Sequence, residues 1–201
     1  MIRRIVLALA FLCTVLAPFG DNARSQTPHD APRGPPADDA TVYRDIARFF
    51  NDLIHAVDPL IVTIDKARFA RDLSSLGNDF ERMITEKNSI ASLLKDNPLK
   101  ATLIDSTARQ LERDVGLSVN HLTNISLLLK ENYQAQGQKL SEDLRTTLLE
   151  RKSWLRQLTG VDLPGAPNDM TAEWARDAKA SANALDQANV ELANLIVKAK
   201  Q

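Results

Sequence analysis

The sequence predicts an all-α fold: an elongated antiparallel bundle of four to five long helices with coiled-coil-like seams, after a signal peptide and a Pro-rich tether. Apolar residues recur every three to four positions from residue 39 onward, and no alternating run typical of a strand interrupts them. With 7 Gly and 9 Pro in 201 residues, the composition excludes collagen-like and low-complexity chains. The single cysteine, Cys13, lies in the expected leader, so the mature chain can form no disulfide and depends on packing.

Residues 1–25 have the order of a secretory signal peptide. Arg3 and Arg4 precede an apolar run over residues 5–16, and small residues follow up to Ser25. We expect cleavage after Ser25 and a periplasmic or secreted mature protein, in a bacterial envelope because the mature chain lacks cysteine. The alternative is an uncleaved anchor, although the run is shorter than the roughly 20 residues that span a membrane.

Residues 26–38 contain four prolines and almost no large apolar side chain. Such a segment cannot bury enough surface to offset the entropy of ordering it. We therefore expect a flexible Pro-rich linker at residues 26–38 and a helical bundle domain at residues 39–201.

The first expected helix covers residues 40–57 and ends at Asp58-Pro59, a cap and proline pair that also suits the start of the next helix. The second helix extends to about residue 95 and carries a heptad seam. Gly77 offers an alternative break there, but the apolar register crosses it unchanged. The seam comprises Val62, Phe69, Leu76, Met83 and Ile90, interleaved with Leu73, Phe80 and Leu94.

Asn97-Pro98 repeats the cap and proline pair and predicts the start of a third helix. The clearest seam of the chain follows, with the polar Ser118 at one core position. It comprises Ile104, Ala108, Leu111, Val115, Leu122, Ile125 and Leu129. The register is lost over residues 134–138, which predicts a bend or short connection, and resumes in a helix over residues 140–158.

A connection with two prolines precedes a last helix over residues 171–200. Its seam is rich in small residues, which predicts close packing. The seam comprises Ala175, Ala178, Ala182, Leu185, Asn189, Leu192, Ile196 and Ala199.

The catalytic and cofactor motifs that would identify an enzyme are missing from the sequence. The three histidines, His29, His55 and His121, are far apart, and the zinc-protease, haem-attachment, phosphate-loop and serine-elbow patterns do not occur. We therefore expect no catalytic residues, no metal ligands and no cofactor. A net charge of −1 and a pI near 6.3 also argue against nucleic-acid binding.

The connection between the last two helices is the first candidate contact site, because it is longer than usual between bundle helices and has apolar residues around it. It could bind a partner or small ligand, or simply cover the end of the core. Its candidate residues are Trp154, Val161, Leu163, Met170 and Trp174.

Arg145, Lys152 and Arg156 share one helical face and form a candidate anion contact, or else an ordinary solvated face. Charged pairs four residues apart suit exposed helix surfaces elsewhere. These pairs are Arg48 with Asp52, Arg68 with Asp72, Arg82 with Glu86, and Lys139 with Asp143.

The sequence thus suggests an exported non-catalytic bundle of the bacterial cell envelope that acts by protein-protein contact, as a scaffold, adaptor or accessory subunit. Its partner would be an unknown envelope protein or a second copy, with the last helix facing it. The alternative is a bundle that binds a small apolar ligand or haem. An inward cluster of acids around His55 or His121 would instead favour an enzyme.

Overall fold

The computed structural model describes residues 39–60, 66–96, 99–160 and 168–200, and helices dominate these ranges. The helices are α1 (Asp39–Leu60), α2 (Lys66–Leu93), α3 (Ala101–Leu127), α4 (Glu131–Gly160) and α5 (Asn168–Ala199). No β-strand occurs in the described ranges, which confirms the predicted all-α helical bundle. The expected signal peptide and tether, residues 1–25 and 26–38, lie outside them.

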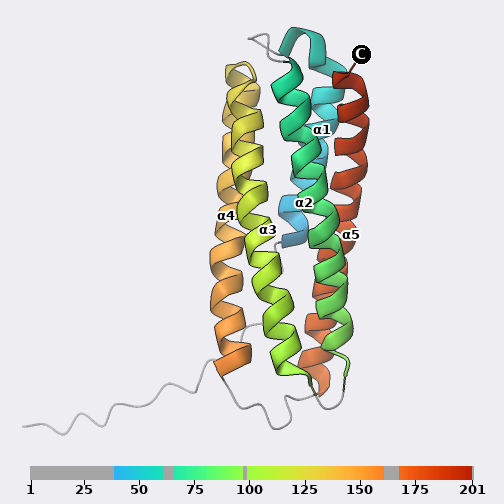
Figure 1. Ribbon diagram of the computed structural model, residues 1–201, viewed down its shortest axis with the longest axis vertical. Coiled ribbons are helices and arrows are strands. Elements are labelled where there is room, and N and C mark those ends of the chain that lie inside the picture. The colour runs from blue at the N-terminus through green and yellow to red at the C-terminus, as the bar shows by residue number, and fades with distance from the viewer. Residues whose placement is uncertain (1–38, 61–65, 97–98, 161–167, 201) are drawn as a thin grey trace, which may run out of the picture. The chain divides into compact units, whose positions relative to one another are not determined.

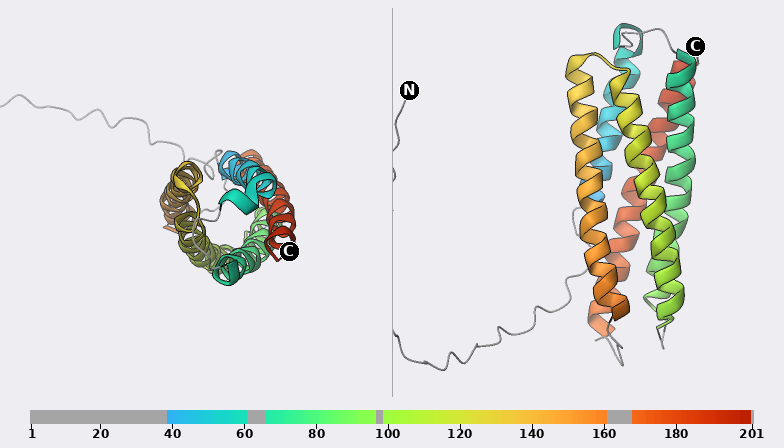
Figure 2. Two further views of the ribbon diagram at one scale, coloured as in Figure 1. Left: turned by 90° about the horizontal axis from the view of Figure 1, so that it is seen from above. Right: turned by 60° about the vertical axis from the view of Figure 1, so that its left-hand side comes forward.

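Successive helices run in opposite directions along the bundle, so α1, α3 and α5 point one way and α2 and α4 the other (Figure 1). Their contacts follow the ring order α1, α5, α2, α3, α4, and α4 closes the ring on α1. The end-on view in Figure 2 shows this ring. An odd number of alternating helices in a closed ring must bring two parallel helices together. That pair is α1 and α5, so the predicted antiparallel arrangement does not hold for it.

The predicted seams form the core. The six apolar seam residues within α3 are buried, as is Leu129 just after it, and Ser118 is fully buried among them. On α1, Ile46, Phe49 and Leu53 are likewise fully buried. Phe49 and Phe50 lie 5.8 Å apart between ring centroids, and Phe50 lies 6.5 Å from Phe80 of α2, so aromatic side chains from two helices occupy the interior.

Helix α2 continues through Gly77, so the alternative break there does not occur. The glycine faces α5. A Cβ at Gly77 would lie 3.8 Å from atoms of Asn189 and Leu192, an ordinary packing distance. The unbroken heptad pattern was therefore a better guide to the helix than the propensity of one residue.

Two predicted helix starts are wrong. Helix α1 continues to Leu60, so Asp58-Pro59 lies in its last turn, and α2 begins at Lys66. Helix α3 begins at Ala101, with Lys100 as a cap residue that makes no side-chain hydrogen bond, whereas Asn97-Pro98 lies outside the described residues. A cap and proline pair is compatible with a helix start without requiring one. In the last turn of α1, Pro59 removes one backbone hydrogen bond, to the carbonyl four residues earlier, and α1 ends at the next residue.

The bend predicted over residues 134–138 is also wrong, because α4 begins at Glu131 and the connection lies at residues 128–130. Small residues replace large apolar ones here because the helices approach closely. A Cβ at Gly137 would lie 2.7 Å from Ser126 Cβ on α3 and 3.2 Å from Phe49 Cζ on α1. The apolar pattern is lost at this position because glycine, which has no Cβ, fits between α3 and α1.

Within the described ranges, none of the helices has the length and apolarity that crossing a membrane would require.

Candidate functional site between α2 and α3

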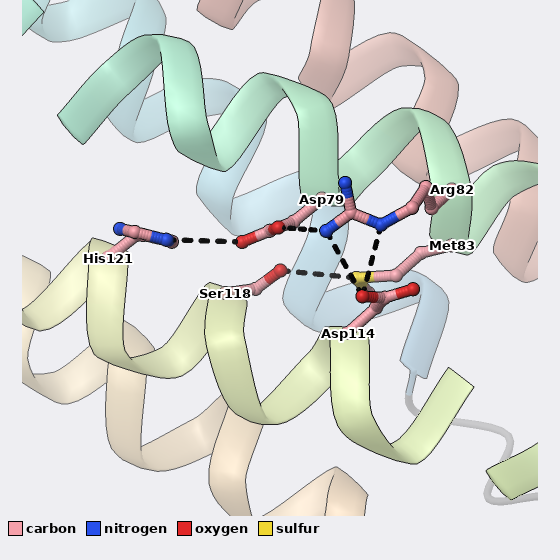
Figure 3. A network of polar contacts seen from close by, with 6 residues as sticks. All are labelled: Asp79, Arg82, Met83, Asp114, Ser118 and His121. Carbon is pink, nitrogen blue, oxygen red and sulfur yellow. Dashed lines mark hydrogen bonds and ion pairs between the residues drawn. The ribbon is translucent and has the colours of Figure 1, made fainter. Parts of the chain in front are cut away.

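The candidate site is a strip of ionisable side chains along the contact between α2 and α3. On α2, Asp79, Arg82 and Glu86 are three and four residues apart and share one edge. On α3, Asp114 and His121 are seven residues apart and also share an edge. Because α2 packs against α3, the two edges meet (Figure 3). We call these five residues the polar seam.

Arg82 joins the two helices of the polar seam. Its Nε donates a hydrogen bond to Asp114 Oδ1 at 3.1 Å, and its Nη2 donates to Asp79 Oδ1 on its own helix. The Arg82 side chain is 48% exposed, whereas the side chains of Asp79 and Asp114 are 4% and 12% exposed. A cation at the rim therefore offsets the charge of two carboxylates that are largely removed from water.

His121 lies beside the more deeply buried of these carboxylates. Its Nε2 is 3.7 Å from Asp79 Oδ2, a distance that allows an ion pair when the imidazole is protonated. Burial raises the pKa of Asp79, while His121 and Arg82 act in the opposite direction by stabilising its carboxylate. His121 Nδ1 is buried and has no hydrogen-bond partner among the described residues.

Glu86 completes the polar seam as the partner of Asp114. Burial raises the pKa of Glu86 to about 7, and Asp114 adds to this rise through charge repulsion and a side-chain hydrogen bond. Arg82 and Arg113 oppose the rise. Near neutral pH, the Glu86 carboxyl is therefore divided between its protonated and ionised forms.

On α3, between Asp114 and His121, Ser118 is the only hydroxyl drawn in Figure 3. Serine, histidine and aspartate are the residue types of a nucleophilic triad, which requires the serine to donate to the histidine. Ser118 instead donates to Met83 Sδ at 3.2 Å and is fully buried. The geometry thus lacks the bond from nucleophile to base, although it places Asp79 beside His121.

A second ionic cluster links the start of α1 to α2 and α5. Lys87 Nζ donates to Asp39 Oδ2 at 2.9 Å and to Ser181 Oγ at 2.8 Å, and it lies 5.0 Å from the ring centroid of Tyr43. The Lys87 and Asp39 side chains are 2% and 4% exposed. Burial lowers the pKa of Lys87, while the charge of Glu86 and the Asp39 carboxylate at 2.9 Å act in the opposite direction by favouring the ammonium. Burial also raises the pKa of Tyr43.

Lys87 was not predicted as a buried residue, although its position in the sequence gives a signal. Lys87 stands seven residues after Phe80 and seven before Leu94, both of which are predicted seam residues. A charged residue at a seam position predicts a buried charge with a partner. Asp79 and Asp114 gave no comparable signal, because they lie beside the seam rather than in it.

The structure describes the predicted contact residues between α4 and α5 only in part. Trp174 is buried, at 2% exposure, so its side chain packs inside the bundle. Trp154 and Met170 lie within α4 and α5, but their side chains fall outside the described structure, as do Val161 and Leu163 entirely. The predicted contact role of this connection therefore remains a prediction.

The predicted anion contact is described at one residue. The Arg145 side chain is 55% exposed and lies 3.7 Å from Glu142. Lys152 and Arg156 belong to α4, with side chains outside the described structure. This contact also remains a prediction.

Two of the four predicted pairs on exposed helix surfaces form, namely Arg68 with Asp72 and Lys139 with Asp143. Two do not, because nearer or less exposed acids compete for the arginines. Arg48 pairs with Asp45, and Arg82 pairs with Asp79 and Asp114 rather than Glu86.

In the described part of the chain, no three or more His, Cys, Asp or Glu side chains are grouped so as to hold a metal ion. The polar seam offers ionic contacts between helices and a carboxyl, Glu86, whose pKa burial raises to about 7.

The chain matches no protein-family model, no curated protein and no solved structure.

Proposed function

We propose that the chain is an exported, non-catalytic helical bundle of the bacterial envelope that acts by protein-protein contact, with a second copy of itself as the first partner. The observation that carries this proposal is an apolar stripe on the outer face of α5. Val190 and Val197 are 54% and 61% exposed, and Ala193, between them, is also exposed. We call Val190, Ala193 and Val197 the outer stripe.

The outer stripe has the spacing of a helix contact. Its residues are three and four apart, so they lie on one face of the helix. The opposite face of α5 packs on α1 and α2, where Leu185, Leu192 and Leu195 are buried. A helix held in a bundle by one face while presenting an apolar line on the other supports docking of a partner helix.

Charge on either side of the outer stripe favours a second copy as that partner. Asp186 lies seven residues before Ala193 on the same line of α5, and Lys200, the first residue after α5, lies seven residues beyond Ala193. Both are exposed. Two copies of α5 that cross antiparallel at Ala193 would place each Asp186 beside Lys200 of the other copy. A two-fold contact uses the same patch twice and must therefore be self-complementary, a condition that this patch meets.

The size of the outer stripe limits the strength of the contact. Three small or medium apolar side chains bury far less area than a permanent dimer interface requires. We therefore expect a weak dimer that dissociates on dilution, as suits a scaffold or adaptor that assembles reversibly.

Disulfide trapping tests the contact, because residues 26–201 contain no cysteine of their own. Ala193→Cys should give a covalent dimer under mild oxidation, in the purified mature chain and in intact bacteria. Leu127→Cys is the matched control, because Leu127 is an exposed apolar residue on α3, at 52%. Equal trapping at both positions, or none at 193, would contradict the proposal.

Charge reversal tests the predicted direction of the two copies. In the Ala193→Cys chain, Asp186→Lys should reduce the trapped dimer, since each new lysine would face Lys200 of the other copy. Adding Lys200→Asp should restore it. Trapping of a different envelope protein would mean that this protein, and not a second copy, is the partner. A co-purifying pigment or small molecule would favour the ligand-binding alternative.

Export is tested separately by the N-terminus of protein taken from the envelope fraction. A chain beginning at Gln26 is expected from cleavage after Ser25. A chain found only in the cytoplasm with its leader intact would contradict the proposed location.

A further inference from the structure

Helix α3 carries large apolar side chains on the outside of the bundle. Leu103, Leu117 and Leu127 are 48%, 45% and 52% exposed. The buried residues of α3 pack against α2 and α4, so these leucines lie on the remaining side of the helix. We call Leu103, Leu117 and Leu127 the α3 stripe.

The α3 stripe has the spacing of a helix contact. Leu117 lies two heptads after Leu103, and Leu127 lies a further heptad plus three residues along the chain. Residues at these spacings follow the line along which two helices of a coiled coil meet. Polar side chains occupy the other positions of that line, which makes a contact there weaker but defines its register. They are Ser106, Gln110, Arg113, Asn120 and Asn124.

Gly116, beside Leu117, is not explained by the packing of the bundle. Glycine disfavours a helix interior relative to alanine. A Cβ at Gly77 or Gly137 would meet atoms of other helices within 4 Å, whereas a Cβ at Gly116 would meet none in the described structure. The bundle thus leaves room for a side chain at position 116. A glycine there suits the close approach of a helix from outside.

The pattern of the α3 stripe fits a second copy of the same helix. Two copies that cross antiparallel midway between Leu103 and Leu127 would bring the two Gly116 residues together near the two-fold axis. A two-fold contact must be self-complementary, and here leucine meets leucine, amide meets amide, and no facing pair has two charges of the same sign. The facing pairs are Leu103 with Leu127, Ser106 with Asn124, Gln110 with Asn120, and Arg113 with Leu117.

We propose that the α3 stripe is a second docking surface of this chain, at which two copies bind antiparallel with Gly116 at the crossing. This inference goes beyond the proposed function, because it uses α3, which makes no contact with α5 in the described ranges. Where the contact through α5 also forms, two different two-fold contacts on each copy would join the copies into an open row. That consequence alone rests on the proposed function.

Disulfide trapping between unlike cysteines tests the pairing. Purified mature chains with Leu103→Cys and with Leu127→Cys, mixed and mildly oxidised, should give several-fold more covalent dimer than either chain alone. Each cysteine would face the other position, whereas like positions would lie roughly 36 Å apart along the helix, 24 residues at about 1.5 Å each. Leu103→Cys mixed with Asn51→Cys, an exposed position on α1, is the matched control.

Three outcomes would overturn the proposal. Trapping of the mixture no greater than the control would mean that the two leucines do not meet. Equal trapping of each chain alone would indicate a parallel contact. Capture of a different protein by Leu103→Cys in envelope extracts, in place of Leu127→Cys, would mean that a second copy is not the partner.

Gly116→Leu separates docking from folding. Leucine favours a helix over glycine, and its Cβ has room in the bundle, so the melting temperature should hold or rise. The same substitution in both cysteine chains should lower the mixed dimer several-fold, because the added side chains would hold the crossing helices apart. Trapping through Ala193→Cys on α5 should not change, which distinguishes failure of this contact from failure of the proposed function. A mixed dimer undiminished by Gly116→Leu would contradict a crossing at this glycine.

Discussion

Helix α2 carries charged side chains on two sides, and these side chains differ in burial and in partners. Toward α1 and α5, Lys87 is almost fully enclosed and meets Asp39 and Ser181 at hydrogen-bonding distance. Toward α3, Arg82 reaches its carboxylates from a half-exposed position, and Glu86 shares its environment with another acid. The first contact joins an ammonium to a carboxylate at 2.9 Å inside the bundle, whereas the second includes a carboxyl, Glu86, whose pKa burial raises to about 7. Burial and the sign of the nearest partner make the difference.

Lys87→Met should give the largest effect and would show how firmly the enclosed side depends on its ion pair. The substitution leaves the Asp39 carboxylate buried without its ammonium, which costs about 3–5 kcal/mol of unfolding free energy. Urea unfolding at pH 7 measures the loss. Lys139→Met is the control, because Lys139 is 74% exposed and pairs at the surface of α4, so its loss should change stability little. Equal losses for both variants would mean that enclosure does not distinguish the two pairs.

Arg82→Gln should give a smaller effect on the α3 side. It removes the guanidinium between Asp79 and Asp114 and should cost about 1–2 kcal/mol, since the arginine is half exposed. The loss should grow from pH 5 to pH 8, because burial raises the pKa of Glu86 to about 7, so Glu86 becomes ionised over this range and adds its charge to the strip that Arg82 no longer neutralises. Arg109→Gln, in an exposed pair with Asp105, should change thermal stability little at either pH. If the free energy lost in Arg82→Gln were the same at pH 5 and pH 8, no carboxyl of the polar seam would titrate between them.

Gly77→Ala should give the smallest effect and the opposite sign. The new methyl group meets Asn189 and Leu192 at ordinary distances on the α5 side, and alanine favours a helix over glycine by about 1 kcal/mol. A small rise in melting temperature is expected. Gly137→Ala is the contrasting variant, because its methyl group would lie 2.7 Å from Ser126 Cβ, so a fall is expected despite the same gain in propensity. Destabilisation by Gly77→Ala would show that α2 and α5 are packed more tightly than these distances indicate.

The helices themselves could be predicted because the spacing of apolar residues that identifies them spans only a few turns of the chain. In α3, spacings of three and four residues identify the buried face directly, and the same pattern carried α2 through Gly77. Helix ends were less accurate. Asp58-Pro59 and the polar run at residues 134–138 both lie inside helices, since a cap or a polar stretch permits an ending that tertiary contacts can override.

The candidate site was largely beyond sequence reasoning. Lys87 occupies a heptad seam position, and side chains at such positions are expected to be buried, as Lys87 is. Asp79, Glu86 and Asp114 were indistinguishable from the many acids of exposed helix faces. Their role arises only when a second helix lies against them.

Local patterns in the sequence were enough to predict that the chain is helical and which face of each helix is apolar, because those properties depend on residues within a few turns of one another. Packing sets what these patterns leave open: the ring order of the helices, the parallel contact of α1 with α5, and the partner of each charged side chain. Residues far apart in the chain, such as Asp39 and Lys87 or Arg82 and Asp114, interact only after packing removes them from water, where charges act more strongly.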